Sequence, residues 1–584
     1  MSIIHHFTNA EIVRMFVKVE AVYTILDSEE NKFRVAGYKQ ARDNLEYYPN
    51  QLIDLYKQNK LKTSSIFGKS IIDKIIELFT TGEVQEWNEL FKQVKPVIFE
   101  LIDIRGIGPK RAHRLVTELN VDTIDDLLKA AQDDRISKLK GFGSKLQETL
   151  KTSIKNYLEE AKAPVKYLLS VGINVSSKIK RYLLKHPDVI EVTVCGSTRR
   201  RAPLIGDIDI AVSTRNFEAV LDYFSDYPLI EKEVTRGKTF RTVLLSSKIQ
   251  VDTRVSIPEK YGSMLQHFTG SRVHNIKMRE KAIEQGYSVS EHGIKNIVTD
   301  EMHFFSKEED IYSFLKLNYV VPELRENELY DHTPDLVQLS DIKGDMHIHT
   351  SFPIETSHDY GSQSMEDTVI RGIGLNYEYI CFSDHNPRQS NMNRTKLLSI
   401  FDERIIEVNR LRKKYPAITI YNMLEVDILP NGELAVPIDI LNEKLDAYLV
   451  SIHSVFDMDS ETMTKRILKG LSHQKAKIYA HPTGRILLDR RPISADWNQI
   501  MNYCAENDKA LEINSSPDRT DLPSVMIEQA RNMKIKLIIS SDAHSLKSLD
   551  LMKYGVYNAR RGVCTKSDIF NTRNEKEFSK WLLK

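Results

Sequence analysis

The sequence predicts a multidomain protein: an α-helical N-terminal region, then a mixed α+β core, then a C-terminal region of the (βα) barrel type. Its 584 residues correspond to about three to five domains. Apolar residues recur at helical spacing through residues 9–160, with few strand-like alternations. Residues 341–584 instead alternate short apolar strands with helical segments, which is typical of βα units.

Composition excludes several classes of protein. A hydrophobic fraction of 41% excludes a disordered tail protein, and four widely spaced cysteines without a CxxC exclude a disulfide scaffold. No apolar run approaches the ~18–20 residues that cross a bilayer, and the N-terminus lacks the pattern of a signal peptide. We therefore expect a reduced, cytoplasmic monomer with no membrane partner.

Charge is nearly balanced overall but unevenly distributed. The net charge of +1 argues, on its face, against a nucleic-acid binder. However, residues 129–201 hold 16 Lys and Arg against 7 Asp and Glu, whereas residues 301–340 hold 3 against 9. Such runs are usually solvated faces, but the basic one also contains glycine-rich turns, which favours phosphate contact. The acidic run contains Pro322 and Pro334 and indicates a linker.

Two short turns in the helical region share the pattern apolar-x-Gly-apolar-Gly-x-Lys, at residues 104–110 and 139–145. Glycine lets the backbone approach a phosphate, and the next helix start supplies free N–H donors. One such turn is weak support, because helix–helix turns often need glycine; two copies are stronger. They resemble helix-hairpin-helix motifs, which grip the DNA backbone without reading its sequence. The expected DNA contacts are Gly106, Gly108, Lys110, Gly141, Gly143 and Lys145.

Three aspartates of the central region form a candidate metal site. Asp207 and Asp209 are two residues apart on a predicted strand, so both carboxylates face one side, and the strand KIQVDTRV adds Asp252. Together they could hold two divalent ions, Mg²⁺ or Mn²⁺, for phosphoryl transfer. The alternative is an ordinary exposed strand edge. A predicted turn at Gly196-Ser197, followed by arginines at 199–201, could cradle a triphosphate and favours the catalytic interpretation.

The motif G-S-x-R-R…G-D-x-D resembles the family X DNA polymerases, which are related to DNA polymerase beta, and residues 267–293 resemble that family's nucleotide-binding stretch. The resemblance implies that the three aspartates are catalytic metal ligands. It also implies nucleotide contacts from Gly196, Ser197, Arg200, Gly206, Phe268, Gly270 and Asn275. His267 replaces a family tyrosine, and Gln250 replaces a basic residue. Lys74 falls where a Schiff-base lysine would be, but exposed lysines on helices are common.

In the C-terminal half, most predicted strands end in a metal-ligating type of residue. A single buried histidine is usually a core residue, but a whole set at successive strand ends indicates a site. The candidates are His347, His349, His385, Glu425, His453, His481, Asp542 and His544. Such mixed sets suit two or three divalent ions, Mn²⁺, Zn²⁺ or Fe²⁺, rather than Mg²⁺ alone.

The order HxH, SDH, E, H, HPTGR, DAH resembles the PHP (polymerase and histidinol phosphatase) family across essentially all of residues 341–584. The resemblance implies a distorted (βα) barrel with a trinuclear metal site. The loop after HxH is longer than in that family; we take Asp359 as its ligand, with Glu355 as the alternative. Arg485 and Asn514 could contact a phosphate, order the loops or be purely structural.

Five segments are expected. They are a helical lyase-like domain (1–93), a helix-hairpin-helix region (94–160), nucleotidyltransferase palm and thumb-like subdomains (161–320), a linker (321–340) and a PHP domain (341–584). The resemblances imply a DNA-directed DNA polymerase of gap-filling repair, using gapped or primed DNA and dNTPs, with a metal-dependent 3′–5′ exonuclease or phosphoesterase. One alternative is a nucleotidyltransferase fused to a small-molecule phosphoesterase of the histidinol-phosphatase kind. Another is a non-catalytic DNA-binding scaffold.

Overall fold

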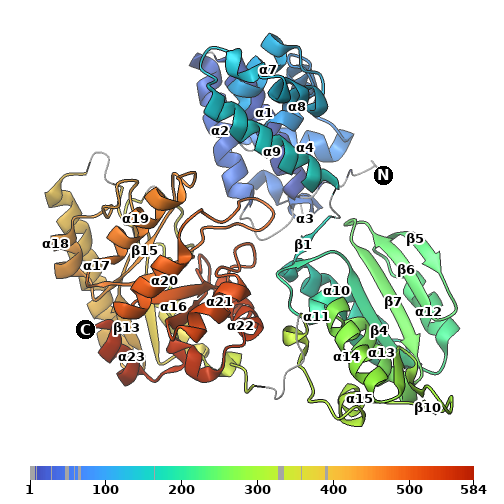
Figure 1. The fold of residues 1–584 in the computed structure, drawn as a ribbon. Coiled ribbons are helices and arrows are strands. Elements are labelled where there is room, and N and C mark those ends of the chain that lie inside the picture. The colour runs from blue at the N-terminus through green and yellow to red at the C-terminus, as the bar shows by residue number, and fades with distance from the viewer. Residues whose placement is uncertain are drawn as a thin grey trace. The chain divides into compact units, whose positions relative to one another are not determined.

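The computed structural model describes the chain outside residues 1–4, 6, 8, 28, 47–51, 58–59, 64–66, 105, 163–164, 327–333, 357 and 389–391. It divides into two compact units, Met1–Pro164 and Val165–Lys584, which are described separately (Figure 1). No described helix is both long and apolar enough to cross a membrane.

The first unit is helical throughout its described residues, as the periodicity predicts. Its helices are α1 (Asn9–Leu26), α2 (Glu29–Glu46), α3 (Leu52–Lys57), α4 (Lys69–Thr81), α5 (Gln85–Phe91), α6 (Ile98–Leu101), α7 (Pro109–Leu119), α8 (Ile124–Gln132) and α9 (Ser144–Lys162), with 3₁₀ turns η1 (Leu61–Thr63) and η2 (Ile136–Lys138). One apolar core runs from Ile12 to Ile154 and includes the buried Trp87, whose indole N–H donates to Tyr38. A single core therefore supports both glycine turns.

The second unit begins with a five-stranded sheet. Its strands are β2 (Val189–Val194), β4 (Ile208–Thr214), β7 (Gln250–Ser256), β6 (Phe240–Leu245) and β5 (Ile230–Arg236), in that spatial order. Only β4 and β7 pair in parallel. Helices α10 (Leu169–Leu183) and α12 (Phe217–Ser225) pack against the sheet, and β1 (Tyr167–Leu168) pairs with β3 (Leu204–Ile205). Alternating burial along β7 sends Val251 and Val255 into the core and leaves Asp252 on the other face.

A smaller α+β body follows the sheet. It contains α13 (Tyr261–Thr269), α14 (Arg272–Glu284), the antiparallel strands β8 (Tyr287–Ser290), β9 (Gly293–Asn296) and β10 (Met302–His303), and α15 (Glu308–Phe314). Arg325, within the expected linker, is completely buried here and pairs with Glu308 at 2.5 Å. The first residues of the expected linker 321–340 therefore pack as part of this body rather than as a free connection.

The C-terminal half consists of parallel strands with intervening helices. The strands are β11 (Gly344–Asp345), β12 (Tyr379–Phe382), β13 (Thr419–Asn422), β14 (Glu425–Asp427), β15 (Tyr448–Ser451), β16 (Ala476–Tyr479), β17 (Ala510–Asn514) and β18 (Lys536–Ser540). Parallel bridges from Ile348 to Ala543 and from His385 to Glu425 join the two sheets. Because most of these strands are buried on both faces, they read as continuous apolar runs.

Helices surround these strands and one of them reaches the first sheet. They are α16 (Met365–Gly374), α17 (Arg394–Lys414), α18 (Ile438–Lys444), α19 (Ser460–Leu471), α20 (Trp497–Glu506), α21 (Ser524–Asn532), α22 (Met552–Arg561) and α23 (Glu575–Leu582). The 3₁₀ turns of this unit are η3 (Pro258–Lys260), η4 (Pro322–Leu324), η5 (Leu339–Asp341), η6 (Ser548–Leu551), η7 (Lys566–Asp568) and η8 (Phe570–Thr572). Tyr554 of α22 is buried in the core of the five-stranded sheet.

Candidate active sites

The three predicted aspartates come together where the neighbouring interior strands β4 and β7 of the five-stranded sheet begin. Asp209 on β4 is the register partner of Asp252 on the parallel strand β7. Asp207 immediately precedes β4 rather than lying within it, because the strand begins at Ile208. Burial, Asp207 and Asp252 together raise the pKa of Asp209 to about 7. Crowded carboxylates of this kind are stabilised by a divalent cation.

Polar neighbours orient Asp252. The Thr242 hydroxyl donates to one of its oxygens, and the Gln250 amide donates to the other at 2.8 Å. Thr242 lies directly opposite Asp252 on β6, and Gln250 is two residues earlier on the same strand face. Gln250, which departs from the family pattern, thus fixes the carboxylate in place.

Position 196 requires a glycine because it lies in close contact with the carboxylate of Asp209. It lies in the one-turn helix α11 (Gly196–Arg199) with φ of 58°, so the expected turn at Gly196-Ser197 is a short helix instead. A Cβ on Gly196 would collide with the carboxylate of Asp209. Ser197 is half-buried in this helix. The motif therefore lies against the acidic cluster.

The three arginines at 199–201, the first of which ends α11, have different environments, and two of them have partners within the protein. Arg199 pairs with the buried Glu308 at 2.8 Å, which fixes α11 to α15. Arg201 stacks over the ring of Tyr557 at 4.4 Å. Arg200 lies beside the predicted nucleotide stretch and donates to the carbonyl of Thr269, while Arg199 also donates to the hydroxyl of the same threonine.

The predicted nucleotide-contacting residues Phe268, Gly270 and Asn275 lie on α13, on the connection after it and on α14. Phe268 has the guanidinium of Arg254 4.3 Å from its ring centroid. A Cβ on Gly270, whose φ is 61°, would lie 3.3 Å from Arg200 Nη1. The Asn275 amide donates to the carbonyl of His267 at 2.8 Å. This hydrogen bond joins α14 to α13.

The two remaining positions of this stretch differ in their surroundings. Gly206 precedes Asp207, and a Cβ there would lie 3.2 Å from the Lys166 ammonium. His267 lies 3.9 Å from Glu291, and burial outweighs that carboxylate and lowers the pKa of the imidazole.

The two glycine turns of the first unit adopt the same local structure. Ile107 N–H donates to Ile104 at 3.0 Å, and Phe142 N–H donates to Leu139 at 2.9 Å. Gly106 and Gly141 have φ of 87° and 85°, which favours glycine. By contrast, Gly108 and Gly143 would place a Cβ in open space. Packing within the described residues therefore does not require glycine at these two positions.

The lysines of the two turns are less informative. Lys110 is exposed and pairs with Asp27 at 2.7 Å. The side chain of Lys145 lies outside the described part of the chain.

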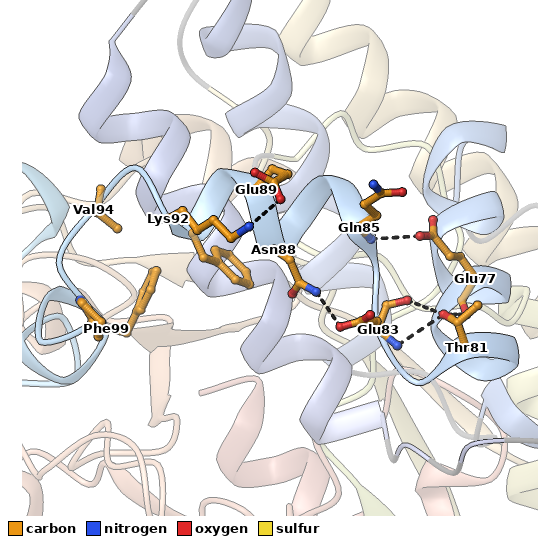
Figure 2. Close-up of a pocket in the computed structure, with 11 residues that line it drawn as sticks. Glu77, Thr81, Glu83, Gln85, Asn88, Glu89, Lys92, Val94 and Phe99 are labelled. Atoms are coloured by element: carbon orange, nitrogen blue, oxygen red, sulfur yellow. Dashed lines mark hydrogen bonds and ion pairs between the residues drawn. The ribbon is translucent and has the colours of Figure 1, made fainter.

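A groove of 890 Å³ in the first unit is acidic (Figure 2). Glu77, Glu83 and Glu89 line it with a single basic residue, Lys92, which pairs with Glu89 at 2.6 Å. This charge disfavours a phosphate ligand. Lys74 is not an exposed lysine: its side chain is 15% exposed, and its ammonium lies 3.1 Å from Glu86.

The second predicted site is centred on Glu425 at the start of β14. Its Oε2 lies 3.0 Å from His385 Nδ1, 3.2 Å from His347 Nε2 and 3.5 Å from His349 Nε2. Its Oε1 lies 2.7 Å from His481 and 3.3 Å from His453. Burial raises the pKa of Glu425, but the surrounding imidazoles outweigh it and lower that pKa well below its usual range.

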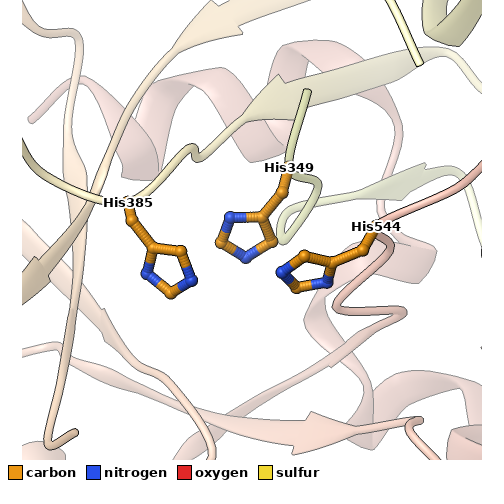
Figure 3. A group of neighbouring side chains, drawn as sticks. All are labelled: His349, His385 and His544. Carbon is orange, nitrogen blue, oxygen red and sulfur yellow. The ribbon is translucent and has the colours of Figure 1, made fainter. Parts of the chain in front are cut away.

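Two further carboxylates complete the cluster. Asp542 lies 3.3 Å from His349 Nε2, and Asp359 lies 3.1 Å from His544 Nε2 and 3.4 Å from His385 Nε2. Figure 3 shows His349 between His385 and His544, with ring centroids 4.3 and 4.1 Å away. Of the two candidates in the lengthened loop, the structure brings Asp359 to the cluster, whereas Glu355 is exposed and pairs with Lys396.

The cluster fits bound metal ions. Among the described residues, several buried atoms that could ligate a metal have no hydrogen-bond partner. These are His347 Nε2, both ring nitrogens of His349, His385 Nδ1, Glu425 Oε2, His481 Nδ1 and His544 Nε2. Buried polar atoms without partners are costly, and metal ions would satisfy them. Among the described residues, four sets of three lie close enough to hold an ion, for example His347, Glu425 and His481.

Carboxylates behind the histidines were missed in the sequence. Glu512 accepts from His347 Nδ1 at 2.8 Å and from the His481 backbone N–H at 2.6 Å. Asp427 contacts His453 Nδ1 at 2.6 Å and His358 Nε2 at 2.8 Å. Such partners fix the orientation of metal-binding histidines. The spacing of Glu425 and Asp427 on one strand was the available signal.

Of the alternatives left open for Arg485 and Asn514, their contacts within the protein fit the ordering of loops and a structural role. Arg485 donates to the backbone carbonyls of Arg519 and Thr520, so it orders a loop. Asn514 donates to Glu512 at 3.1 Å and to Asp542 at 3.0 Å. Arg519, which the sequence did not single out, has its Nε 3.5 Å from Asp542, while its buried Nη1 has no hydrogen-bond partner among the described residues.

Comparison with known proteins agrees with the arrangement of both units. Residues 264–326 match the family model "DNA polymerase beta thumb", and residues 98–156 match "SAM-like Helix-hairpin-helix tandem". The chain is 29% identical over 578 residues to a Bacillus subtilis (strain 168) protein named DNA polymerase/3′-5′ exonuclease PolX, covering 98% of this chain and 99% of that protein. The chain is similar to PolX-like family X DNA polymerases. Both glycine turns and the stretch around Gly270 lie within the segments of this chain that match the two family models.

A solved structure of Leishmania infantum polymerase beta, a ternary P/T complex, also matches. It is 21% identical, with a TM-score of 0.26, and covers 39% of this chain and 98% of that one.

Proposed function

We propose that this chain extends primers on gapped or primed DNA with dNTPs, and that its C-terminal half is a PHP-type barrel with 3′–5′ exonuclease activity. One observation carries the proposal. Two separate clusters suited to metal ions lie in a chain that matches, over 98% of its length, a relative named as both polymerase and 3′–5′ exonuclease. The carboxylate cluster serves nucleotidyl transfer, and the histidine cluster serves phosphodiester hydrolysis.

At the first site, Asp207, Asp209 and Asp252 would hold Mg²⁺ or Mn²⁺. Divalent ions bound there would supply charge stabilisation for in-line phosphoryl transfer. Asp252, oriented by Thr242 and Gln250, would lie beside the primer 3′-hydroxyl that attacks the α-phosphate.

Residues around α11 and α13 would bind the nucleotide. Ser197 and Arg200 would carry the negative charge of the leaving pyrophosphate, since a guanidinium and a hydroxyl both donate hydrogen bonds to phosphate. The remaining expected contacts are Gly196 and Gly206 to the triphosphate, Phe268 and Gly270 to the sugar, and Asn275 near the base edge.

Both glycine turns would hold the DNA backbone. The open space beside Gly108 and Gly143 supports this assignment, because glycine there serves no packing within the described fold. A phosphate could approach the backbone N–H groups at the starts of α7 and α9.

At the second site, the described cluster of His347, His349, Asp359, His385, Glu425, His453, His481, Asp542 and His544 would hold two or three Mn²⁺, Zn²⁺ or Fe²⁺ ions. Ions bound there would supply Lewis acidity toward a phosphodiester. Arg519 would anchor the phosphate, because its buried Nη1 is a donor with no hydrogen-bond partner among the described residues.

Assays of the wild-type protein with a DNA substrate and with a small-molecule substrate test the proposal. A 5′-labelled primer on a gapped duplex with Mn²⁺ should lengthen when dNTPs are present and shorten when they are absent. EDTA should stop both reactions. Release of phosphate from histidinol phosphate without shortening of the primer would instead favour the small-molecule phosphoesterase. Neither reaction on DNA would refute the proposal.

A further inference from the structure

The last residue of helix α22, Arg561, reaches from the C-terminal half to the nucleotide-binding Arg200. Arg561 Nη1 donates to the backbone carbonyl of Arg200 at 2.9 Å and to Glu326 Oε1 at 3.0 Å. The same Glu326 oxygen accepts from Arg200 Nε at 3.3 Å. One carboxylate oxygen is therefore shared by two guanidinium groups, one from each half of this unit.

Further contacts fix α22 to this place. Tyr557, four residues before Arg561 and on the same helix face, stacks under Arg201 at 4.4 Å. Tyr554 is buried in the core of the five-stranded sheet. The helix thus holds residues 200 and 201 by a hydrogen bond, an ion-pair network and a stacked ring. Each contact involves a largely buried group; the Arg561 side chain is 12% exposed.

Charge decides what this network does to Arg200. Burial raises the pKa of Glu326, but Arg561 and Arg200 outweigh it and keep the carboxylate ionised. With two cations on one anion, the group retains a net positive charge. Without Arg561, Glu326 would form an exclusive ion pair with Arg200, and an incoming triphosphate would have to displace it.

We propose that Arg561 is a positioning residue for nucleotide binding: it shares Glu326, orients the Arg200 backbone and so leaves the Arg200 side chain available to the triphosphate. The inference rests on the proposed polymerase function. It makes nucleotide affinity at the first site dependent on a residue of the half that carries the histidine cluster.

The test uses single-nucleotide insertion into a one-nucleotide gap by the full chain. Arg561→Ala should raise KM for dNTP about tenfold, as for the loss of a charge-assisted hydrogen bond, and change kcat little. Arg560→Ala is the matched control, since Arg560 crosses the same interface to Glu323 at 2.9 Å without touching Arg200. Its KM should stay near that of the wild type.

A second substitution separates positioning from general damage. Glu326→Gln removes the competing charge, so adding it to Arg561→Ala should restore KM toward the wild-type value. Equal KM values for Arg561→Ala and Arg560→Ala, or no recovery in the double variant, would overturn the inference. If Arg561→Ala does not fold, Glu326→Gln alone decides: KM at or below the wild-type value supports the inference, and a higher KM refutes it. Absence of insertion by the wild type would refute the polymerase proposal instead.

Discussion

At the scale of single residues, the acidic cluster of the first site is destabilising on its own. Asp209 is packed beside Asp252 on the neighbouring strand and against Gly196, which leaves no room for relaxation. Burial, together with the neighbouring Asp207 and Asp252, raises the pKa of this carboxyl, because all three disfavour its ionised form. The site therefore stores unfavourable free energy that bound cations would offset.

This cost predicts how stability depends on pH. Asp209 has a folded-state pKa of about 7, above the ~3.9 of an unfolded aspartate. Between these values the folded state binds the extra proton, so stability falls as pH rises toward and through 7. Asp209→Asn should remove the penalty and raise the melting temperature by about 2–4 °C at pH 8 in EDTA.

Two comparisons check the origin of that gain by calorimetry. The gain should be smaller at pH 5, where the folded-state carboxyl is already protonated. Saturating Mg²⁺ should reduce it at pH 8, since cations stabilise the ionised aspartate. A gain of the same size at pH 5 and pH 8 would show that the carboxylates do not repel one another as described.

The sequence predicted single residues well where they lie on strands. Alternation placed Asp252 on a face away from the core, and strand ends predicted the histidines and Glu425. The sequence predicted less in loops, because the length of a loop does not fix the direction in which its side chains point. The choice between Asp359 and Glu355 and the presence of Arg519 depended on how loops fold back over the site.

At the scale of elements, the two glycine turns are near-duplicates that use glycine for two different reasons. The first glycine of each turn has a positive φ and is needed for the turn itself. The second lies in open space and is available to a partner. Sequence repetition predicted the pair, but only backbone geometry separates the two roles.

This division of roles predicts a DNA-binding variant that folds normally. Gly108→Ala with Gly143→Ala should leave the helical circular dichroism unchanged and weaken binding to a gapped duplex about tenfold, by blocking close approach of phosphates. Binding by the wild type should also fall as salt rises. Fluorescence anisotropy measures both effects.

Gly37→Ala is the matched control, because Gly37 also has open space beside it but lies within α2, outside both turns. It should bind DNA as the wild type does. Unchanged DNA affinity in the double variant, with normal folding, would contradict the assignment of the turns to DNA contact.

The arginine run shows what an element-level pattern cannot predict. Three consecutive arginines read as one basic patch, yet α11 ends among them, so their side chains diverge. Arg199 is committed to Glu308 and Arg201 to Tyr557, partners over 100 residues away in the sequence. Only long-range packing could reveal this.

At the scale of the whole molecule, the near-zero net charge conceals local differences. A basic stretch spans residues 129–201 and an acidic one spans 301–340, so the average says little about DNA. The order of the helical region, sheet and parallel strands followed from periodicity. Periodicity did not predict that α22 joins the C-terminal half to the first sheet. The sequence shows that this helix has an apolar face but not which element that face packs against.

We propose that one chain carries two independent metal-dependent sites. The most direct test places Asp252→Asn and Glu425→Gln in separate full-length proteins and gives each a 5′-labelled primer on a gapped duplex with Mn²⁺, with and without dNTPs. We predict that Asp252→Asn shortens the primer but does not extend it, and that Glu425→Gln extends it but does not shorten it. Loss of both reactions in either variant, with the fold retained, would contradict the claim.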